Sequence, residues 1–205
     1  MPKIKLSKGE LKRQRDALKQ YERYLPTLQL KKQQLQLEIL TQYSLLAARK
    51  HFLETRSKAA LTWAGLLIES PKELKQWVAP KQTVTSLKNV AGVDVPVFER
   101  AEFAGAEYDL FDTPLWVDQA IEHLKELISL RQELNVIEKG IVVLRQELRV
   151  TTQRVNLFEK VKIPEAQEAI RIIKIYIGDQ MANAVGRSKI AKRKIEEAVF
   201  EEVAA

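Results

Sequence analysis

The chain has 205 residues, including seven glycines, seven prolines and no cysteine. Its composition is rich in Leu, Lys, Glu, Gln and Ala, which is typical of a mostly helical protein, and the lack of cysteine excludes disulfides and thiolate metal sites. The net charge is +7. No segment reaches the roughly 20 apolar residues that span a bilayer, and the amino terminus has no apolar signal core, so we expect a cytoplasmic protein without a membrane span.

The first predicted element is a long helix over residues 8–69. Ser7 and Glu10 have the spacing of a capping box, in which a hydroxyl and a carboxylate bind free N–H groups at a helix start. Pro26 removes one backbone hydrogen bond, so we expect a kink there. Eight of nine residues at seven-residue intervals are apolar, as in a stripe that faces a partner helix: Leu11, Leu18, Leu25, Lys32, Ile39, Leu46, Leu53, Ala60 and Leu67. A companion row is more polar: Gln14, Tyr21, Leu28, Leu35, Gln42, Arg49, Arg56 and Trp63.

A small insert is predicted over residues 70–113. It begins with a second capping box that holds a proline at the first helical position, which predicts a short helix over about 71–78. Residues 93–98 alternate like a strand, and we expect a β-hairpin that turns near residues 91–92. Pro96 would restrict this strand to a sheet edge.

The second long helix is predicted over residues 114–200. Two apolar rows with seven-residue spacing, one from Leu127 to Val155 and one from Leu130 to Phe158, form a fuller seam than in the first helix. Pro164 predicts a second kink. The predicted fold is therefore all-α: a long antiparallel two-helix coiled coil with a small mid-chain insert, forming a single elongated domain over residues 1–205. An ordinary bundle of amphipathic helices is the alternative.

The charge is distributed unevenly along the chain. Residues 1–32 carry ten basic and three acidic side chains, and residues 187–194 carry five basic and no acidic side chains. If the chain closes into a hairpin about residue 95, these segments meet at one basic tip, and Pro26 lies level with Pro164. We therefore expect a functional basic tip and one shared bend. A solvated helix face is the alternative explanation for the charge.

The segment 151–164 reads TTQRVNLFEKVKIP. It resembles the carboxy-terminal signature of the D subunits of V-type and archaeal-type (V/A) ATPases, which reads roughly TTRRVNALExVVIP. The chain departs from that pattern at Gln153, Leu157, Phe158 and Lys162. The matching residues are Thr151, Thr152, Arg154, Val155, Asn156, Glu159, Val161, Ile163 and Pro164. The basic residues near the end of the chain and the Gly-Val-Asp-Val-Pro sequence at 92–96 also resemble this family.

The resemblance implies a central-stalk rotor shaft that stands inside a hexamer of A and B subunits. It implies two further partners, a small F subunit and a C/d-type adaptor of the membrane rotor, with protons or sodium ions as the transported ion. Such a protein is cytoplasmic, peripheral to the membrane and non-catalytic. The candidate partner-interface residues are Arg154, Asn156, Gly140, Arg187, Lys189, Lys192 and Lys194.

Three of these candidates leave alternatives open. Gly140 interrupts the fuller seam, where glycine costs about 1 kcal/mol relative to alanine in a helix. It is either a tolerated surface glycine or a place where a partner such as the F subunit approaches closely. Arg154 and Asn156 either contact a partner or support the kink ahead of Pro164.

The sequence shows no catalytic constellation. No glycine opens a Walker A loop, and His51 and His123 lack neighbours with metal-ligand spacing. We therefore expect no enzymatic activity, no cofactor and no metal. A basic coiled-coil scaffold or a nucleic-acid-binding protein is the alternative function, because the sequence pI is near 9.5. No Arg and aromatic side chains interleave along the helices, so we expect no nucleic-acid partner.

Overall fold

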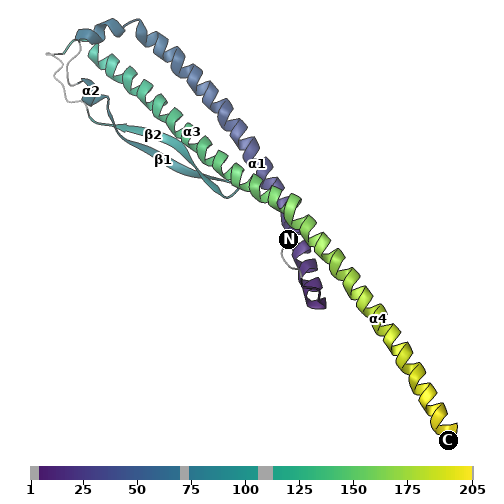
Figure 1. The fold of residues 1–205 in the computed structure, drawn as a ribbon. Coiled ribbons are helices and arrows are strands. Elements are labelled where there is room, and N and C mark those ends of the chain that lie inside the picture. The colour runs from purple at the N-terminus through teal and green to yellow at the C-terminus, as the bar shows by residue number, and fades with distance from the viewer. Residues whose placement is uncertain (1–4, 70–73, 106–112, 205) are drawn as a thin grey trace. The chain divides into compact units, whose positions relative to one another are not determined.

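The computed structural model describes residues 5–69, 74–105 and 113–204, and their element order is α1-η1-α2-β1-β2-α3-η2-α4 (Figure 1). The chain divides into two compact units. We call residues 30–152 the middle unit, and residues 1–29 together with 153–205 the terminal unit. Among the described helices, none contains a sufficiently hydropathic stretch of the length that a bilayer span requires.

Helix α1 spans Lys8–Leu61, and its start confirms the serine half of the predicted capping box. The hydroxyl of Ser7 accepts a hydrogen bond from the N–H of Glu10 at 3.2 Å. The glutamate half is wrong, because the Glu10 carboxylate accepts from the Gln14 side chain and the Ser7 N–H donates to the Lys5 carbonyl. The helix is assigned without a break across Pro26, so the proline does not end it.

The predicted end of this helix at residue 69 is wrong, because the α-helix ends at Leu61 and a 3₁₀ helix, η1, follows over Ala64–Glu69. At the change, the hydroxyl of Thr62 donates to the carbonyl of Ala59 at 2.7 Å, and the Trp63 N–H donates to the Ala60 carbonyl three residues back. Such tighter bonds replace the α-helical ones. Gly65, a poor helix former, then disfavours a return to the α-helix.

The insert contains the predicted hairpin. Strands β1 (Pro80–Val90) and β2 (Val93–Phe103) pair antiparallel. The turn residues Ala91 and Gly92 have φ angles of 52° and 77°, as a two-residue type I′ turn requires. Asn89 also supports the turn, because its side-chain oxygen accepts the Gly92 N–H at 3.0 Å.

Helix α2 spans Leu74–Trp77, inside the predicted short helix. The capping box predicted for its start, at residues 70–73, lies outside the described residues. Val93 and Val95 of β2 are buried at 6% and 3% exposure, which anchors the hairpin on the long helices.

The second half of the chain begins with α3 (Val117–Leu157), three residues after the predicted start, because Pro114 and the next two residues form a turn in which the Val117 N–H donates to the Pro114 carbonyl. A π-helix, η2 (Phe158–Lys162), follows, and α4 spans Ile163–Ala204. At the π-helix the Ile163 N–H donates to the Phe158 carbonyl, five residues back. Pro164 has no N–H to continue an α-helical ladder, so the predicted disturbance at this proline takes the form of a wider π turn.

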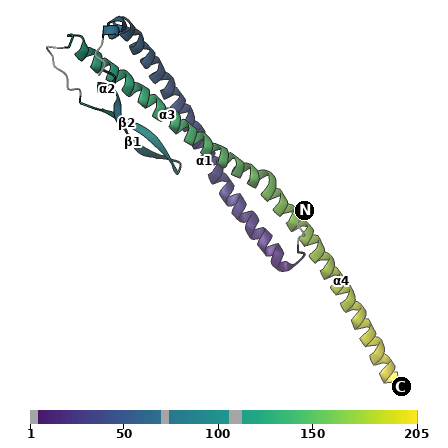
Figure 2. The ribbon, with the colours of Figure 1, turned by 60° about the vertical axis from the view of Figure 1, so that its left-hand side comes forward.

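Helices α1 and α3 pack antiparallel in the middle unit, which confirms the predicted arrangement. One buried cluster joins Leu35 of α1 to Leu144 of α3, and a second joins Leu46 of α1 to Leu134 of α3. The residue numbers of the α3 partners decrease as those of α1 increase, and this order occurs only in antiparallel helices. The hairpin lies along α3 in both views (Figure 1, Figure 2). A third cluster closes the far end of the unit: Leu74, Val117 and Ile121, with Leu67, Trp77, Val78, Trp116 and Leu124 around them.

The two prolines do not lie at one level. In the terminal unit, Tyr21 of α1 stacks on Phe158, with ring centroids 5.3 Å apart. Pro26 lies five residues beyond Tyr21 and therefore opposite about residue 153, roughly 11 residues or about 16 Å along the helix from Pro164 at 1.5 Å per residue. The predicted shared bend is wrong because the helices pair about residue 90, and not about residue 95.

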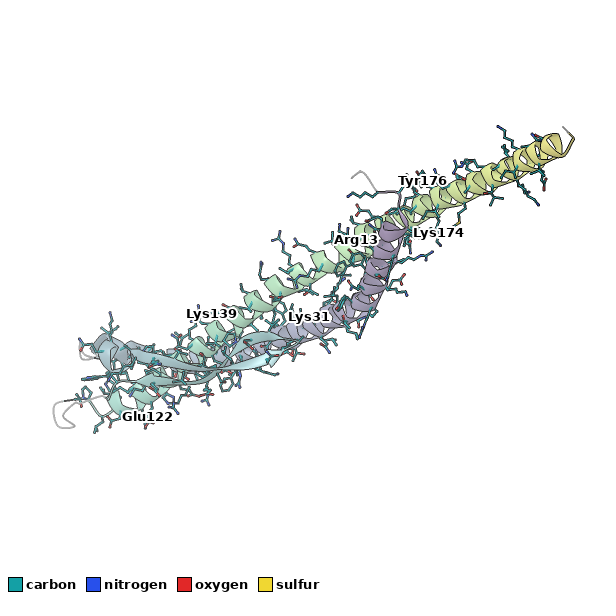
Figure 3. All side chains as sticks on the ribbon, turned by 90° about the horizontal axis from the view of Figure 1, so that it is seen from below. Arg13, Lys31, Glu122, Lys139, Lys174 and Tyr176 are labelled. Atoms are coloured by element: carbon teal, nitrogen blue, oxygen red, sulfur yellow. The ribbon has the colours of Figure 1, made fainter. Side chains whose placement is uncertain are left out.

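The same register separates the two basic segments. The start of α1 at Lys8 lies opposite about residue 171, and Figure 3 labels Arg13 on this end of α1 and Lys174 on α4. Residues 187–194 therefore lie beyond the start of α1. The predicted meeting of both basic ends at one tip is wrong, because α3, η2 and α4 together are longer than α1.

Candidate interaction surfaces

Gly140 receives the chain's own hairpin. A β-carbon built at this position would lie 3.0 Å from Cγ1 of Val95 and 3.6 Å from the carbonyl oxygen of Pro96. Gly140 is itself buried. The interpretation as a surface glycine is therefore wrong, and the close approach that it permits is made by β2. A partner contact at Gly140 is not supported, because the hairpin occupies that space.

Ion pairs between α1 and α3 line the helix seam of the middle unit. The guanidinium of Arg49 lies 3.0 Å from the carboxylate of Glu133, and that of Arg56 lies 3.3 Å from Glu126. Both arginines belong to the more polar of the two rows with seven-residue spacing on the first helix, and their ion pairs show that this row also faces α3. Glu126 and Glu133 repeat the same seven-residue spacing on α3, which is the signal that sequence reasoning missed. Each pair is partly exposed and adds little stability, but the set favours one register.

The signature segment, residues 151–164, has one buried face and one exposed face. Thr151 and Val155 are buried at 2% and 3% exposure, and Phe158 stacks on Tyr21. Arg154 and Asn156 are exposed. Among the described residues, neither makes a hydrogen bond or an ion pair, so the alternative that such bonds support the local bend has no contact in its favour.

Further along, the segment that follows the signature is anchored by Ile170 and Ile173, which are 8% and 0% exposed. On the outer face, Arg171 binds Glu168 through two hydrogen bonds of 2.8 and 2.6 Å. This guanidinium holds the pKa of Glu168 below its usual value. Both groups are exposed, so the pair holds two side chains in place on the helix surface and adds little to the stability of the fold.

The last part of α4 is a bare helix. Every residue from 178 to 199 is exposed, so no other described part of the chain covers it. Its basic candidates are accessible: Arg187, Lys189, Lys192 and Lys194. Lys192 pairs with Glu196 at 3.6 Å, whereas the other three make no ion pair with a described residue. Apolar side chains are interspersed among them: Met181, Val185, Ile190, Ile195 and Val199, all more than half exposed.

Two of the grooves that the described residues of the middle unit form are larger than about 600 Å³. The first, of about 630 Å³, is bordered by Leu37 and Leu40 of α1, each 65% exposed, and by Leu148 of α3. The second, of about 870 Å³, lies between the hairpin and α3, and Thr83, Thr85, Pro96, Lys139 and Val142 are among its lining residues. The first groove is mainly apolar, which suits a protein surface better than a small polar ligand.

The described residues contain no cluster of three or more His, Asp or Glu side chains that could hold a metal ion. His123 stands beside Trp63, with ring centroids 6.0 Å apart, and its Nδ1 lies 3.9 Å from Glu126. Arg56 also pairs with Glu126, so these side chains belong to the helix seam.

Comparison with known proteins gives one consistent result. The family model for the D subunit of ATP synthase matches residues 10–193. The chain is 44% identical over 195 residues to the V-type ATP synthase D subunit of Borreliella burgdorferi, which covers 95% of this chain and 96% of that protein. It is 32% identical over 197 residues to the protein of the same description from Chlamydia trachomatis, covering 95% and 97%. It is 30% identical to the protein from Chlamydia caviae over 95% of this chain and 94% of that one.

Proposed function

The chain belongs to the family of V-type ATP synthase D subunits, the central-stalk subunits of V/A-type ATPases, and we propose that it is the rotor shaft of such a complex. In this role it transmits torque between a hexamer of A and B subunits and the ion-translocating membrane rotor. The observation that carries the proposal is the bare helix over residues 178–199. A single helix with exposed apolar side chains gains most of its stability from packing against a partner.

The A and B hexamer is the partner that we assign to this bare helix. Its basic and apolar side chains suit a ring whose inner surface offers apolar area together with carboxylates or carbonyls. Because the helix is asymmetric and the ring has threefold repetition, each orientation contacts the three catalytic interfaces differently. Such differential contact biases the interfaces into different states in turn. Arg154 and Asn156, exposed on α3, are further candidates for contact with the complex.

The other two partners fit the middle unit. The apolar groove beside Leu37, Leu40 and Leu148 suits the small F subunit. The side chains of Leu37 and Leu40 are each 65% exposed, and a protein that covered the groove would remove this apolar surface from water. The end closed by the third cluster exposes Ile68 at 89% and Leu115 at 94%. This apolar end suits the C/d-type adaptor of the membrane rotor.

In the proposed role the chain itself makes and breaks no bonds, and it works as a peripheral, cytoplasmic part of the complex. Its contribution is mechanical, because helix backbones are held by internal hydrogen bonds and the seam side chains resist sliding. The basic pI is the one observation behind the alternative of a scaffold or a nucleic-acid-binding coiled coil, and the arrangement of the basic residues does not suit base stacking. The exposed basic residues of α4 alternate with aliphatic side chains, and not with the aromatic ones that stack on bases.

The test is co-purification with the A and B hexamer over a salt series. The informative variant replaces Arg187 and Lys189 by Gln, which keeps the helix and removes two unpaired charges. The matched control replaces Lys58 and Lys75 of the middle unit by Gln, which changes the net charge equally. We expect the α4 variant to bind at least about threefold more weakly at low salt and to lose less affinity as salt rises, because screening then has fewer charges to act on. The control is expected to bind like the parent chain.

Deletion of residues 187–205 is the stronger version of the same test. It removes both the charge and the apolar surface, so binding should fall at every salt concentration. If the truncated chain binds the hexamer as tightly as the full chain throughout the series, α4 is not the docking element and the proposed orientation of the shaft is wrong.

A further inference from the structure

The edges of the β-hairpin differ in their backbone groups. In a hairpin with a two-residue turn, the residues that flank the turn exchange hydrogen bonds, and every second pair beyond them points its N–H and C=O groups outward. Val90 and Val93 flank the turn, and Leu87 pairs with Pro96. The pairs whose N–H and C=O groups point away from the partner strand therefore include Leu87 with Pro96 and Thr85 with Phe98. Pro96 agrees with this phase, because it has no N–H to give to β1.

The outer edge of β2 is closed. Pro96 offers no donor at the centre of that edge. The same stretch of β2 lies against α3, where Val95 and the carbonyl of Pro96 meet the space above Gly140. No further strand can pair with β2 there without displacing the helix.

The outer edge of β1 is open. Over Thr83–Leu87 it carries no charged residue and no proline, and no described strand other than β2 pairs with it. The register irregularity between Val84 and Thr85 places its extra residue in β2, and the other irregularity, at Lys81 of β1, lies before this stretch, so β1 is regular over Thr83–Leu87. Leu87 is 70% exposed. Proteins commonly protect such an edge with charges, prolines or a covering element, and none of these protects Thr83–Leu87.

The charge on β1 indicates what covers it. The strand contains Lys81 and Lys88 and no acidic residue. Lys88 reaches Glu38 of α1 at 3.7 Å but remains 61% exposed, and Lys81 makes no ion pair with a described residue. Opposite charges on neighbouring strands stabilise a sheet, and like charges destabilise it. An incoming strand with acidic side chains therefore fits this edge.

We propose that the outer edge of β1 over Thr83–Leu87 binds an extended acidic segment of another subunit of the ATPase complex as a third strand. This inference rests on the proposed function, since it places the hairpin inside that complex. Main-chain hydrogen bonds at Thr85 and Leu87 provide the pairing, as in other cases of strand addition. The exposed Leu87 side chain packs on an apolar residue of the added strand.

Residue-resolved hydrogen exchange tests the pairing directly, with the chain alone and in the assembled complex. Alone, the outward N–H groups of Thr85 and Leu87 exchange fast, whereas the inward N–H of Ser86 is protected by β2. In the complex we expect exchange at Thr85 and Leu87 to slow at least about tenfold and at Ser86 to stay unchanged. A covering helix or loop would not produce this alternation.

Two substitutions at one position provide the second test. Leu87→Pro removes an outward N–H without removing a bond to β2, as Pro96 does on the other strand, and Leu87→Ala removes only the side chain. We expect affinity for the rest of the complex to fall at least about tenfold for the proline variant, through the lost hydrogen bond and the ring in the path of the strand, and less than about threefold for the alanine variant. Protection of Ser86 in the isolated variants checks that the hairpin remains paired.

Each other outcome overturns the inference in a recognisable way. Equal affinities of the two variants, or no alternation of exchange in the complex, leave the chain as a shaft but remove the third strand. Alternating protection in the chain alone that grows with its concentration assigns the edge to a second copy of the chain. If the chain does not enter the complex at all, the proposed function falls as well.

Discussion

Gly140→Ala tests whether the hairpin is wedged against α3. The new β-carbon would lie 3.0 Å from Cγ1 of Val95, well inside the roughly 3.5–4.0 Å at which carbon atoms attract best. Val95 is 3% exposed, so it has little space to move. Overpacking of a core costs about 1–3 kcal/mol, while alanine improves helix propensity by about 1 kcal/mol. We expect a net destabilisation of about 1 kcal/mol in equilibrium urea unfolding.

The control and a double variant isolate the contact. Gly178→Ala gives the same propensity gain in α4, where nothing lies within 4 Å of the new atom, and it should be neutral or stabilising. Val95→Ala removes the atom that clashes, so Gly140→Ala should become harmless in that background, with a coupling of at least about 1 kcal/mol. If Gly140→Ala stabilises the chain as much as Gly178→Ala does and shows no coupling to Val95, the close approach does not exist in solution.

Three further expectations concern single contacts. Leucine at Tyr21 and at Phe158 should show a coupling of about 0.5–1.5 kcal/mol in a double-mutant cycle measured by urea unfolding, as stacked aromatic pairs do; additive effects would mean that the two rings do not meet. Arg49→Gln should change the unfolding free energy by less than about 1 kcal/mol, because its pair with Glu133 is partly exposed; a loss of several kcal/mol would contradict that assignment. Ala91→Gly should raise the midpoint of thermal unfolding, because Ala91 has a φ of 52°, which costs a residue with a β-carbon about 1–2 kcal/mol; a lower midpoint would mean that its methyl packing outweighs the backbone strain.

The long helices and their antiparallel packing could be predicted because burial repeats along them. Leu46 and Leu53 belong to the apolar row of the first helix, and Leu134 and Ile141 belong to the second helix, and the four residues gather in or beside one cluster. The hairpin turn was also predictable, because glycine adopts a positive φ without steric cost and Gly92 stands directly before a strand-like segment. These features depend on neighbours within a few residues.

The features that sequence reasoning missed depend on contacts between distant segments. The register follows from the packed pairs, which centre the hairpin on about residue 90 and not on residue 95, so the predicted levels of Pro26 and Pro164 and the predicted position of the basic segments were wrong. Gly140 was recognised as unusual, but its partner lies 45 residues earlier in the chain, in β2. The end of α1 depends on the side chain of Thr62, which competes locally for a backbone carbonyl. Among the predicted interface residues, Arg154, Asn156 and the basic residues of α4 lie on exposed surfaces, which leaves their roles as proposals.

The packing of the middle unit explains why a two-helix seam can resist sliding under torque. Moving α1 along α3 by one turn would take Leu35 and Leu144, both 0% exposed, out of their cluster, at about 1.5–3 kcal/mol for each side chain. It would also separate Arg49 from Glu133. In addition, it would disturb the contacts of Val95, which packs in the same cluster as Leu35 and Leu144 and lies against Gly140. The hairpin thus adds a third element that must be displaced before the helices can slip, and the partly exposed ion pairs favour the native register without having to supply most of the resistance.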